Sequence, residues 1–279
     1  MSLMSTRARI LFAGVLSGIT LLIAQGAVAE SAALRSLNGR AAASAAIGGG
    51  EFHSVLPTGT DSKAIKVAPF HLDRTPVTNA DFLEFVRTHE EWRRNRVVAI
   101  FADEQYLHSW SSPLTPGPAA QSLQPVTSVS WFAARAYCES QGKRLPSWYE
   151  WEFAAAADEH TADARRDVAW QQRILAWYSR PSTVPLSRVA SAPSNVYGVY
   201  DLHGLVWEWV EDFNALMISG DDRARGDSDV LKFCGAGALA LENREEYAVA
   251  MRIALLSSLQ ARDTTNNLGF RCVSKGTPL

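Results

Sequence analysis

The chain has 279 residues, of which 27 are Lys or Arg and 29 are Asp or Glu, so its formal net charge is −2. This near balance excludes the strongly basic surface of a typical nucleic-acid-binding protein. Apolar residues make up 47% and charged residues 20% of the chain, which excludes a disordered or fibrous protein. Three cysteines are too few for a disulfide-built miniprotein, and they lack the closely spaced pairs of a zinc ribbon.

The N-terminus carries the pattern of an export signal. Arg7 and Arg9 precede an apolar run over residues 10–24, and residues 27–29, Ala-Val-Ala, match a signal-peptidase site. We therefore predict a signal peptide over residues 1–29, a periplasmic location and no membrane span after cleavage. An uncleaved anchor is the alternative, but the run is shorter than the about 20 apolar residues that span a bilayer.

The start of the mature chain predicts a leader, two strands and a helix. Residues 30–46 are rich in Ala, Ser and Gly, which is typical of a flexible leader. Apolar stretches over residues 52–56 and 65–72 predict strands, because turn-forming residues separate them. Thr78 is the predicted N-cap of a helix that runs to about Trp92.

The remaining chain predicts helices followed by short strands. Arginines within 93–96 are interpreted as a solvated face, with a binding surface as the alternative. Residues 130–142 predict a helix between a serine cap and a glycine, and residues 147–157 predict another that opens with a Ser-x-x-Glu capping box. Residues 161–178 are charged and predicted helical, and from residue 196 onward we expect short strands between turns.

Five aromatic-containing segments occur in a fixed order along the chain. They are TPVTNADF (75–82), PVTSVSW with YC (125–138), GKRLP with EWE (142–152), YGVYDLHG with WEW (197–209) and NLGFRC (267–272). Together they resemble the formylglycine-generating enzyme family, also called the sulfatase-modifying-factor family. The resemblance implies one irregular, loop-rich α+β domain over residues 47–275, distantly similar to C-type lectins. Within the family, the chain looks most like NirV-type accessory proteins, which are associated with copper nitrite reductases.

The resemblance also implies a structural calcium site. In the family, the positions of Asp201 and Glu208 bind calcium through side chains, and those of Gly204 and Val206 bind it through backbone carbonyls. Oxygen ligands of this kind suit a hard cation. The alternative is that Asp201 only caps a turn and that Glu208 only pairs with an arginine. His203 is interpreted as a hydrogen-bonded structural group.

The copper-binding cysteines of the family have no counterpart in this sequence. Formylglycine-generating enzymes bind copper(I) with two cysteines, because soft thiolates suit that ion. One alignment places Ala240 and Glu245 at those positions, and another places Asn243 and Ala248 there. Cys234 stands where the family has arginine. We therefore expect no copper and no formylglycine-generating activity.

Two functions fit this pattern, and the catalytic residues, if there are any, stay unknown. The first is an accessory or maturation protein that binds a peptide or protein partner, such as a copper nitrite reductase. The alternative is a periplasmic oxidase that resembles PvdO and acts on a small peptide-derived substrate. In the family, residues 239–262 line the substrate cleft, whereas a solvated face over a core strand is the other interpretation here.

The resemblance implies a disulfide between Cys138 and Cys272, since these positions are paired in some family members. An oxidising compartment favours such a bond. Cys234 would then remain a thiol. Pairing of Cys234 with Cys272 is the rival arrangement, and three free thiols are the third.

Overall fold

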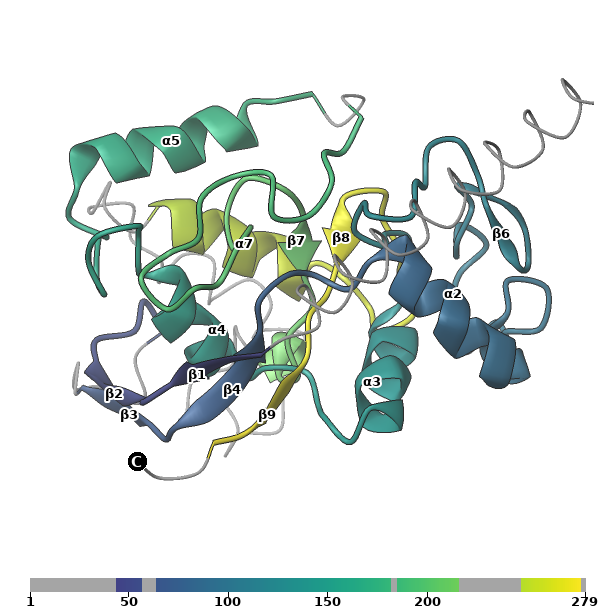
Figure 1. Ribbon diagram of the computed structural model, residues 1–279, viewed down its shortest axis with the longest axis horizontal. Coiled ribbons are helices and arrows are strands. Elements are labelled where there is room, and N and C mark those ends of the chain that lie inside the picture. The colour runs from purple at the N-terminus through teal and green to yellow at the C-terminus, as the bar shows by residue number, and fades with distance from the viewer. Residues whose placement is uncertain (1–43, 57–63, 182–184, 216–246, 277–279) are drawn as a thin grey trace, which may run out of the picture. The chain divides into compact units, whose positions relative to one another are not determined.

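The computed structural model describes residues 44–56, 64–181, 185–215 and 247–276, all of which belong to one compact unit, Ala43–Leu279. The predicted signal peptide, most of the leader, Cys234 and the aligned positions 240–245 lie outside these ranges. No helix within them is long and apolar enough to cross a membrane. The described chain combines helices with several small sheets (Figure 1), in agreement with the α+β class.

A three-stranded antiparallel sheet brings the two ends of the domain together. Strands β1 (Ser44–Ile47), β4 (Phe70–Asp73) and β9 (Val273–Lys275) lie in the order β1-β4-β9 (Figure 1). β1 includes residues 44–46, which the sequence assigned to the leader. Since β4 pairs on one side with β1 and on the other with β9, the C-terminal strand completes a sheet that begins near residue 44.

The predicted strand over residues 65–72 is two strands. β3 (Ile65–Val67) pairs with β2 (Gly50–Phe52), whereas β4 belongs to the three-stranded sheet. Pro69 separates them, since proline has no N–H to donate to a ladder. Gly49, at φ 68°, precedes β2, and a Cβ there would lie 2.2 Å from the Val67 carbonyl oxygen. Gly49 is therefore required by the fold.

Two further strand pairs have only a few residues each. β5 (Trp110–Ser112) pairs with β6 (Thr115–Pro116) inside the proline-rich loop. β7 (Trp207–Glu208) runs parallel to β8 (Leu268–Gly269). The second pair places the WEW motif beside the NLGFRC motif, although about sixty residues separate them in the sequence.

The first helix, α2 (Asn79–Thr88), ends earlier than predicted. Thr78 and Asp81 form a reciprocal capping box at its start. At its end, Arg93 donates from Nε to the Val86 carbonyl oxygen at 2.9 Å. The 3₁₀ turn η1 (Glu90–Trp92) follows. The solvated-face interpretation is therefore wrong for Arg93, because its guanidinium caps the helix.

Four more helices complete the described fold. Serine or aspartate side chains cap three of them, as the sequence predicts for the first two. They are α3 (Trp131–Ser140), α4 (Trp148–Ala155), α5 (Val168–Tyr178) and α7 (Tyr247–Ser257), with the 3₁₀ turn η2 (Phe213–Ala215) before α7. α7 corrects the expectation of strands beyond residue 196. Its Ala, Leu, Met and Arg residues favour a helix.

The disulfide joins Cys138 of α3 to Cys272, which directly precedes β9. Their Cα atoms are 5.5 Å apart, and the bond spans 134 residues. Both cysteines are fully buried. This is the pair that the resemblance implies, and Cys234 is the one cysteine of the sequence that remains.

Candidate functional site

A buried ion pair lies where the two central motifs meet. Arg271 donates from Nη2 to Glu208 Oε1 at 2.7 Å and from Nε to Glu208 Oε2 at 2.9 Å. Trp151 of α4 donates from Nε1 to Glu208 Oε2 at 2.9 Å. Both members of the pair are 0% exposed. The parallel pairing of β7 with β8 positions them, and the pair neutralises the Glu208 carboxylate.

Arg271 also binds two segments of backbone. Its Nη1 donates to the carbonyl oxygen of Asp73 at 3.1 Å, and its Nη2 donates to that of Tyr200 at 2.8 Å. The sheet and the 200–208 turn are therefore fixed to the same guanidinium. The N–H groups of Arg271 all donate to acceptors of the protein itself, so the role of this side chain is structural.

The predicted calcium ligands lie around a tight turn, and they make different interactions there. Asp201 and Gly204 have positive φ angles of 59° and 100°. Asp201 Oδ2 accepts a hydrogen bond from the Ala190 N–H at 2.6 Å, whereas Glu208 is committed to Arg271 and Trp151. Burial raises the pKa of Asp201, and the negative charge of Glu208 raises it further. The structure thus contains both interactions of the alternative interpretation, a turn contact at Asp201 and an arginine at Glu208.

Of the two predicted carboxylate ligands, Asp201 fits a hard cation and Glu208 does not fit it as well. Asp201 has one carboxylate oxygen without a partner among the described residues, and a cation there would offset the cost of its burial. Glu208 would have to share an oxygen that Arg271 already holds. Within the described ranges, no group of three His, Cys, Asp or Glu side chains is placed to hold a metal ion.

His203 is a neutral structural group. Its ring lies edge-on to the indoles of Trp151 and Trp170, with centroid distances of 5.6 and 5.3 Å. Its Nε2 is 2.9 Å from the carbonyl oxygen of Ala155, so Nε2 carries the proton. Burial lowers the pKa of His203 to about 4. This agrees with the structural role inferred from the sequence.

Arg252 is a buried cation without a carboxylate of its own. It extends from α7, its guanidinium carbon lies 3.6 Å from the centroid of the Trp151 ring, and its Nη2 donates to the Glu208 carbonyl oxygen. Its Nε is buried and has no partner among the described residues. Burial lowers its pKa to about 10. Arg252 belongs to the stretch that the resemblance assigns to a substrate cleft, but its side chain is in the core.

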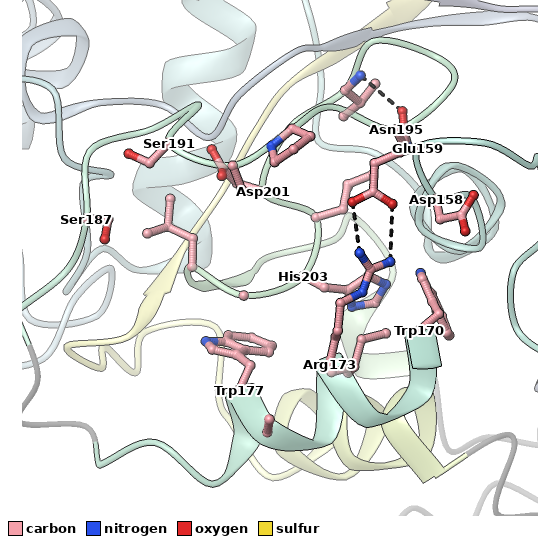
Figure 2. A pocket seen from close by; sticks show the side chains of 18 of the residues that line it. Asp158, Glu159, Trp170, Arg173, Trp177, Ser187, Ser191, Asn195, Asp201 and His203 are labelled. Carbon is pink, nitrogen blue, oxygen red and sulfur yellow. Dashed lines mark hydrogen bonds and ion pairs between the residues drawn. The ribbon is translucent and has the colours of Figure 1, made fainter. Parts of the chain in front are cut away.

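An open pocket of about 530 Å³ adjoins the Asp201 turn (Figure 2). One wall is a single face of α5, with Trp170, Arg173 and Trp177 at helical spacing. The opposite wall comes from residues 187–205 and includes Asp201 and His203. Figure 2 shows Arg173 of α5 joined to Glu159, at 3.0 and 3.1 Å.

An aromatic cluster connects the pocket helix to the WEW motif. The rings of Tyr178 and Trp207 stack at 4.9 Å with an interplanar angle of 9°. Trp177 lies 5.1 Å from Trp207 and also lines the pocket. All three side chains are partly exposed. This pocket was not predicted from the sequence, although aromatic residues seven positions apart on a predicted helix were a visible signal.

Comparison with known proteins gives a match over nearly the whole chain. A model of the sulfatase-modifying factor enzyme 1-like domain matches residues 30–276. An inactive Cα-formylglycine-generating enzyme 2 of Bos taurus is 30% identical over 281 residues, covering 85% of this chain and 89% of that protein. A formylglycine-generating enzyme of Streptomyces coelicolor is 30% identical over 260 residues, covering 77% and 81%.

Two solved structures align with most of the chain at low sequence identity. PvdO from Pseudomonas aeruginosa aligns over 82% of this chain and 93% of its own, with a TM-score of 0.42 and 18% identity. CarF aligns over 83% and 97%, with a TM-score of 0.46 and 19% identity.

Proposed function

The chain belongs to the sulfatase-modifying factor enzyme 1-like family, and we propose that it is an exported accessory protein that binds a peptide or protein partner. One observation carries the proposal. The sequence has three cysteines, and two of them form the buried disulfide. A copper(I) site needs two thiolates, and Cys234 is the one cysteine that remains to supply a thiolate. The oxidation of a cysteine substrate by such a site is not part of this function.

The relatives support a non-catalytic member without deciding it. The Bos taurus protein is named as inactive and the Streptomyces coelicolor protein is named as an enzyme, yet each is 30% identical to this chain. Overall identity therefore does not separate the two activities. The proposal rests instead on the thiol count of this chain, because copper(I) chemistry depends on a particular pair of side chains rather than on the fold.

The pocket beside α5 is the place that we propose for the partner. It combines two indoles with charged groups, as binding sites for peptides commonly do. Following the NirV-type resemblance, the partner that we propose is a periplasmic copper nitrite reductase.

Binding and chemistry are tested separately. The mature chain, from Glu30, is immobilised and presented with purified copper nitrite reductase. We expect retention that Trp177→Ala weakens and that Leu175→Ala leaves unchanged, since Leu175 is on α5 but does not line the pocket. Thermal unfolding of both variants checks that the fold is intact. Equal retention by the two variants would remove the pocket from the proposal.

The second measurement concerns activity and metal content. We expect no formylglycine when the mature chain is incubated with a sulfatase-type cysteine peptide, oxygen and added copper. Turnover would overturn the accessory function. Stoichiometric iron or copper in the protein purified from the periplasm would instead favour the PvdO-like oxidase.

Calcium at Asp201, Gly204, Val206 and Glu208 stays a proposal drawn from the resemblance. The unpartnered Asp201 oxygen and the turn supply oxygen ligands of the right type. The ion would supply positive charge that stabilises the turn, while Arg271 continues to hold Glu208.

A further inference from the structure

Asp201 presents an uncommitted carboxylate oxygen in the wall of the pocket (Figure 2). Its Oδ2 accepts from the Ala190 N–H at 2.6 Å, and its Oδ1 has no partner in the part of the chain that the structure describes. A partly buried carboxylate with an open acceptor favours a ligand group that carries positive charge and a proton to donate.

The opposite wall suits the same kind of group. Trp170 and Trp177 contribute indole surface from one face of α5, and the face of an indole attracts cations. Arg173 is on the same helix face, but Glu159 binds it through both terminal nitrogens at 3.0 and 3.1 Å. The charge of Arg173 is therefore neutralised and does not repel a cation in the pocket.

Two arginines of the pocket lining carry charge of the opposite sign, whereas Asp158 adds a second carboxylate, whose Oδ1 already accepts from the N–H groups of His160 and Thr161. Arg180 follows α5 and Arg188 is in the facing loop, and both are exposed. Neither has a carboxylate partner in the described part of the chain. Guanidinium groups bind carboxylates through paired hydrogen bonds. The pocket thus offers an acceptor at Asp201 and donors at Arg180 and Arg188.

We propose that this pocket binds a peptide segment in which a basic side chain and a carboxylate are close neighbours. In the calcium-free protein the ammonium of the basic side chain binds Asp201, its methylene stem contacts Trp177, and the carboxylate binds Arg180 and Arg188. Calcium and the ammonium compete for the same Asp201 oxygen, so added calcium should weaken binding of the peptide. This rests on the proposed function and specifies the chemistry of the partner segment. A volume of about 530 Å³ is within the range of sites that hold small ligands, and it is suited to a few residues rather than to a whole domain.

The test uses short blocked peptides, so that only side chains carry charge. The probe is N-acetyl-Ala-Lys-Glu-Ala-amide. One control peptide has norleucine in place of lysine, which keeps the stem and removes the ammonium. A second has glutamine in place of glutamate. Affinity is measured by isothermal titration calorimetry with the mature chain at low salt, first without and then with added calcium chloride.

Three variants separate the two ends of the pocket. Asp201→Asn removes the acceptor charge, and Arg188→Ala removes one guanidinium. Glu139→Gln is the matched control, because it removes an exposed carboxylate of α3 that does not line the pocket. Thermal unfolding shows whether each variant is folded.

We expect Asp201→Asn to weaken binding of the lysine peptide by about tenfold or more, as for a lost hydrogen bond between charged groups. Binding of the norleucine peptide should not change. Arg188→Ala should weaken binding of the glutamate peptide more than that of the glutamine peptide. Such differences support direct contact, since a merely structural role would affect all peptides equally.

Other outcomes overturn the inference. Equal losses for the lysine and norleucine peptides would show that Asp201 acts only through the fold. Binding of calcium at Asp201 that the lysine peptide cannot displace would assign that oxygen to the metal. Failure of every peptide to bind would also refute the inference, whereas the nitrite reductase experiment would still test the proposed function on its own.

Discussion

Arg252 covers the indole of Trp151, with its guanidinium carbon 3.6 Å from the ring centroid. The two residues are about a hundred positions apart, on α7 and α4. The only described carboxylate that contributes to the charge environment of Arg252 is that of Glu208, and Arg271 holds it. The indole face and one backbone carbonyl therefore replace a counter-ion for this buried cation.

This arrangement predicts that a positive charge at position 252 is not enough to keep the stability of the fold. Arg252→Lys keeps the charge but loses the planar group and is more strongly hydrated, so we expect the free energy of unfolding to fall by about 1–3 kcal/mol. Arg252→Met should cost less, because it keeps a stem on the indole and buries no charge. Urea unfolding of both variants measures this. A lysine variant as stable as wild type would contradict it.

The disulfide between Cys138 and Cys272 is expected to stabilise the fold strongly. Replacing both cysteines with alanine should lower the free energy of unfolding by about 2–5 kcal/mol, since the bond closes a loop of 134 residues. Urea unfolding measures the loss, and Cys234→Ser is the control that should behave like wild type. A peptide map under non-reducing conditions that links Cys234 to either partner would contradict this pairing.

Glu152 should make stability depend on pH. It is buried and accepts hydrogen bonds from the Val55 N–H and from Trp148 Nε1, both at 2.8 Å. Burial nevertheless raises its pKa. Between about 4.3, the usual pKa of Glu, and the raised value, the folded protein binds a proton that the unfolded chain does not. This part of the stability is therefore present at low pH and lost as pH rises.

The comparison with Glu152→Gln isolates that contribution. We expect the free energy of unfolding of wild type, relative to that of the variant, to decrease from pH 4 toward pH 7. Urea unfolding at several pH values measures the difference. A difference that stays constant, or that increases with pH, would show that burial does not raise the pKa of Glu152.

Calcium binding predicts a ligand-dependent stability that Asp201 controls. If the ion binds at the turn, the melting temperature of the mature chain should rise with calcium and fall with a chelator, because a ligand bound only to the folded state stabilises it. Asp201→Asn should abolish the response, and Glu139→Gln should keep it. A wild-type melting temperature that is insensitive to both calcium and chelator would refute the site.

Glu208→Gln is a separate test of the ion pair. It leaves Arg271 as a buried charge without its partner, so we expect a loss of about 3–5 kcal/mol whether or not calcium is present. A loss that appears only in the presence of calcium would assign Glu208 to the metal instead. Thermal or urea unfolding with and without chelator distinguishes these results.

Features whose partners are local in the sequence, or whose pattern is shared with the family, could be predicted without the structure. Thr78 and Asp81, like Ser147 and Glu150, form capping boxes across three residues, so their chemistry is visible in a short window. The ordered motifs identified the family and, through it, the cysteines that pair. The hydrogen-bonded, structural role of His203 was also predicted.

The pairing of charged side chains that are distant in the sequence is visible only in the folded protein. Glu208 and Arg271 are 63 residues apart, and no local pattern selects this partner over the other arginines of the chain. Likewise, the apolar periodicity of residues 247–257 is too weak to distinguish a helix from a buried strand. The structure shows that this segment is a helix, α7, which packs against α5 and η2. The pocket depends on the approach of α5 to the Asp201 turn. The position of α5 depends on packing throughout the domain, where the burial of apolar side chains and the pairing of charges depend on each other.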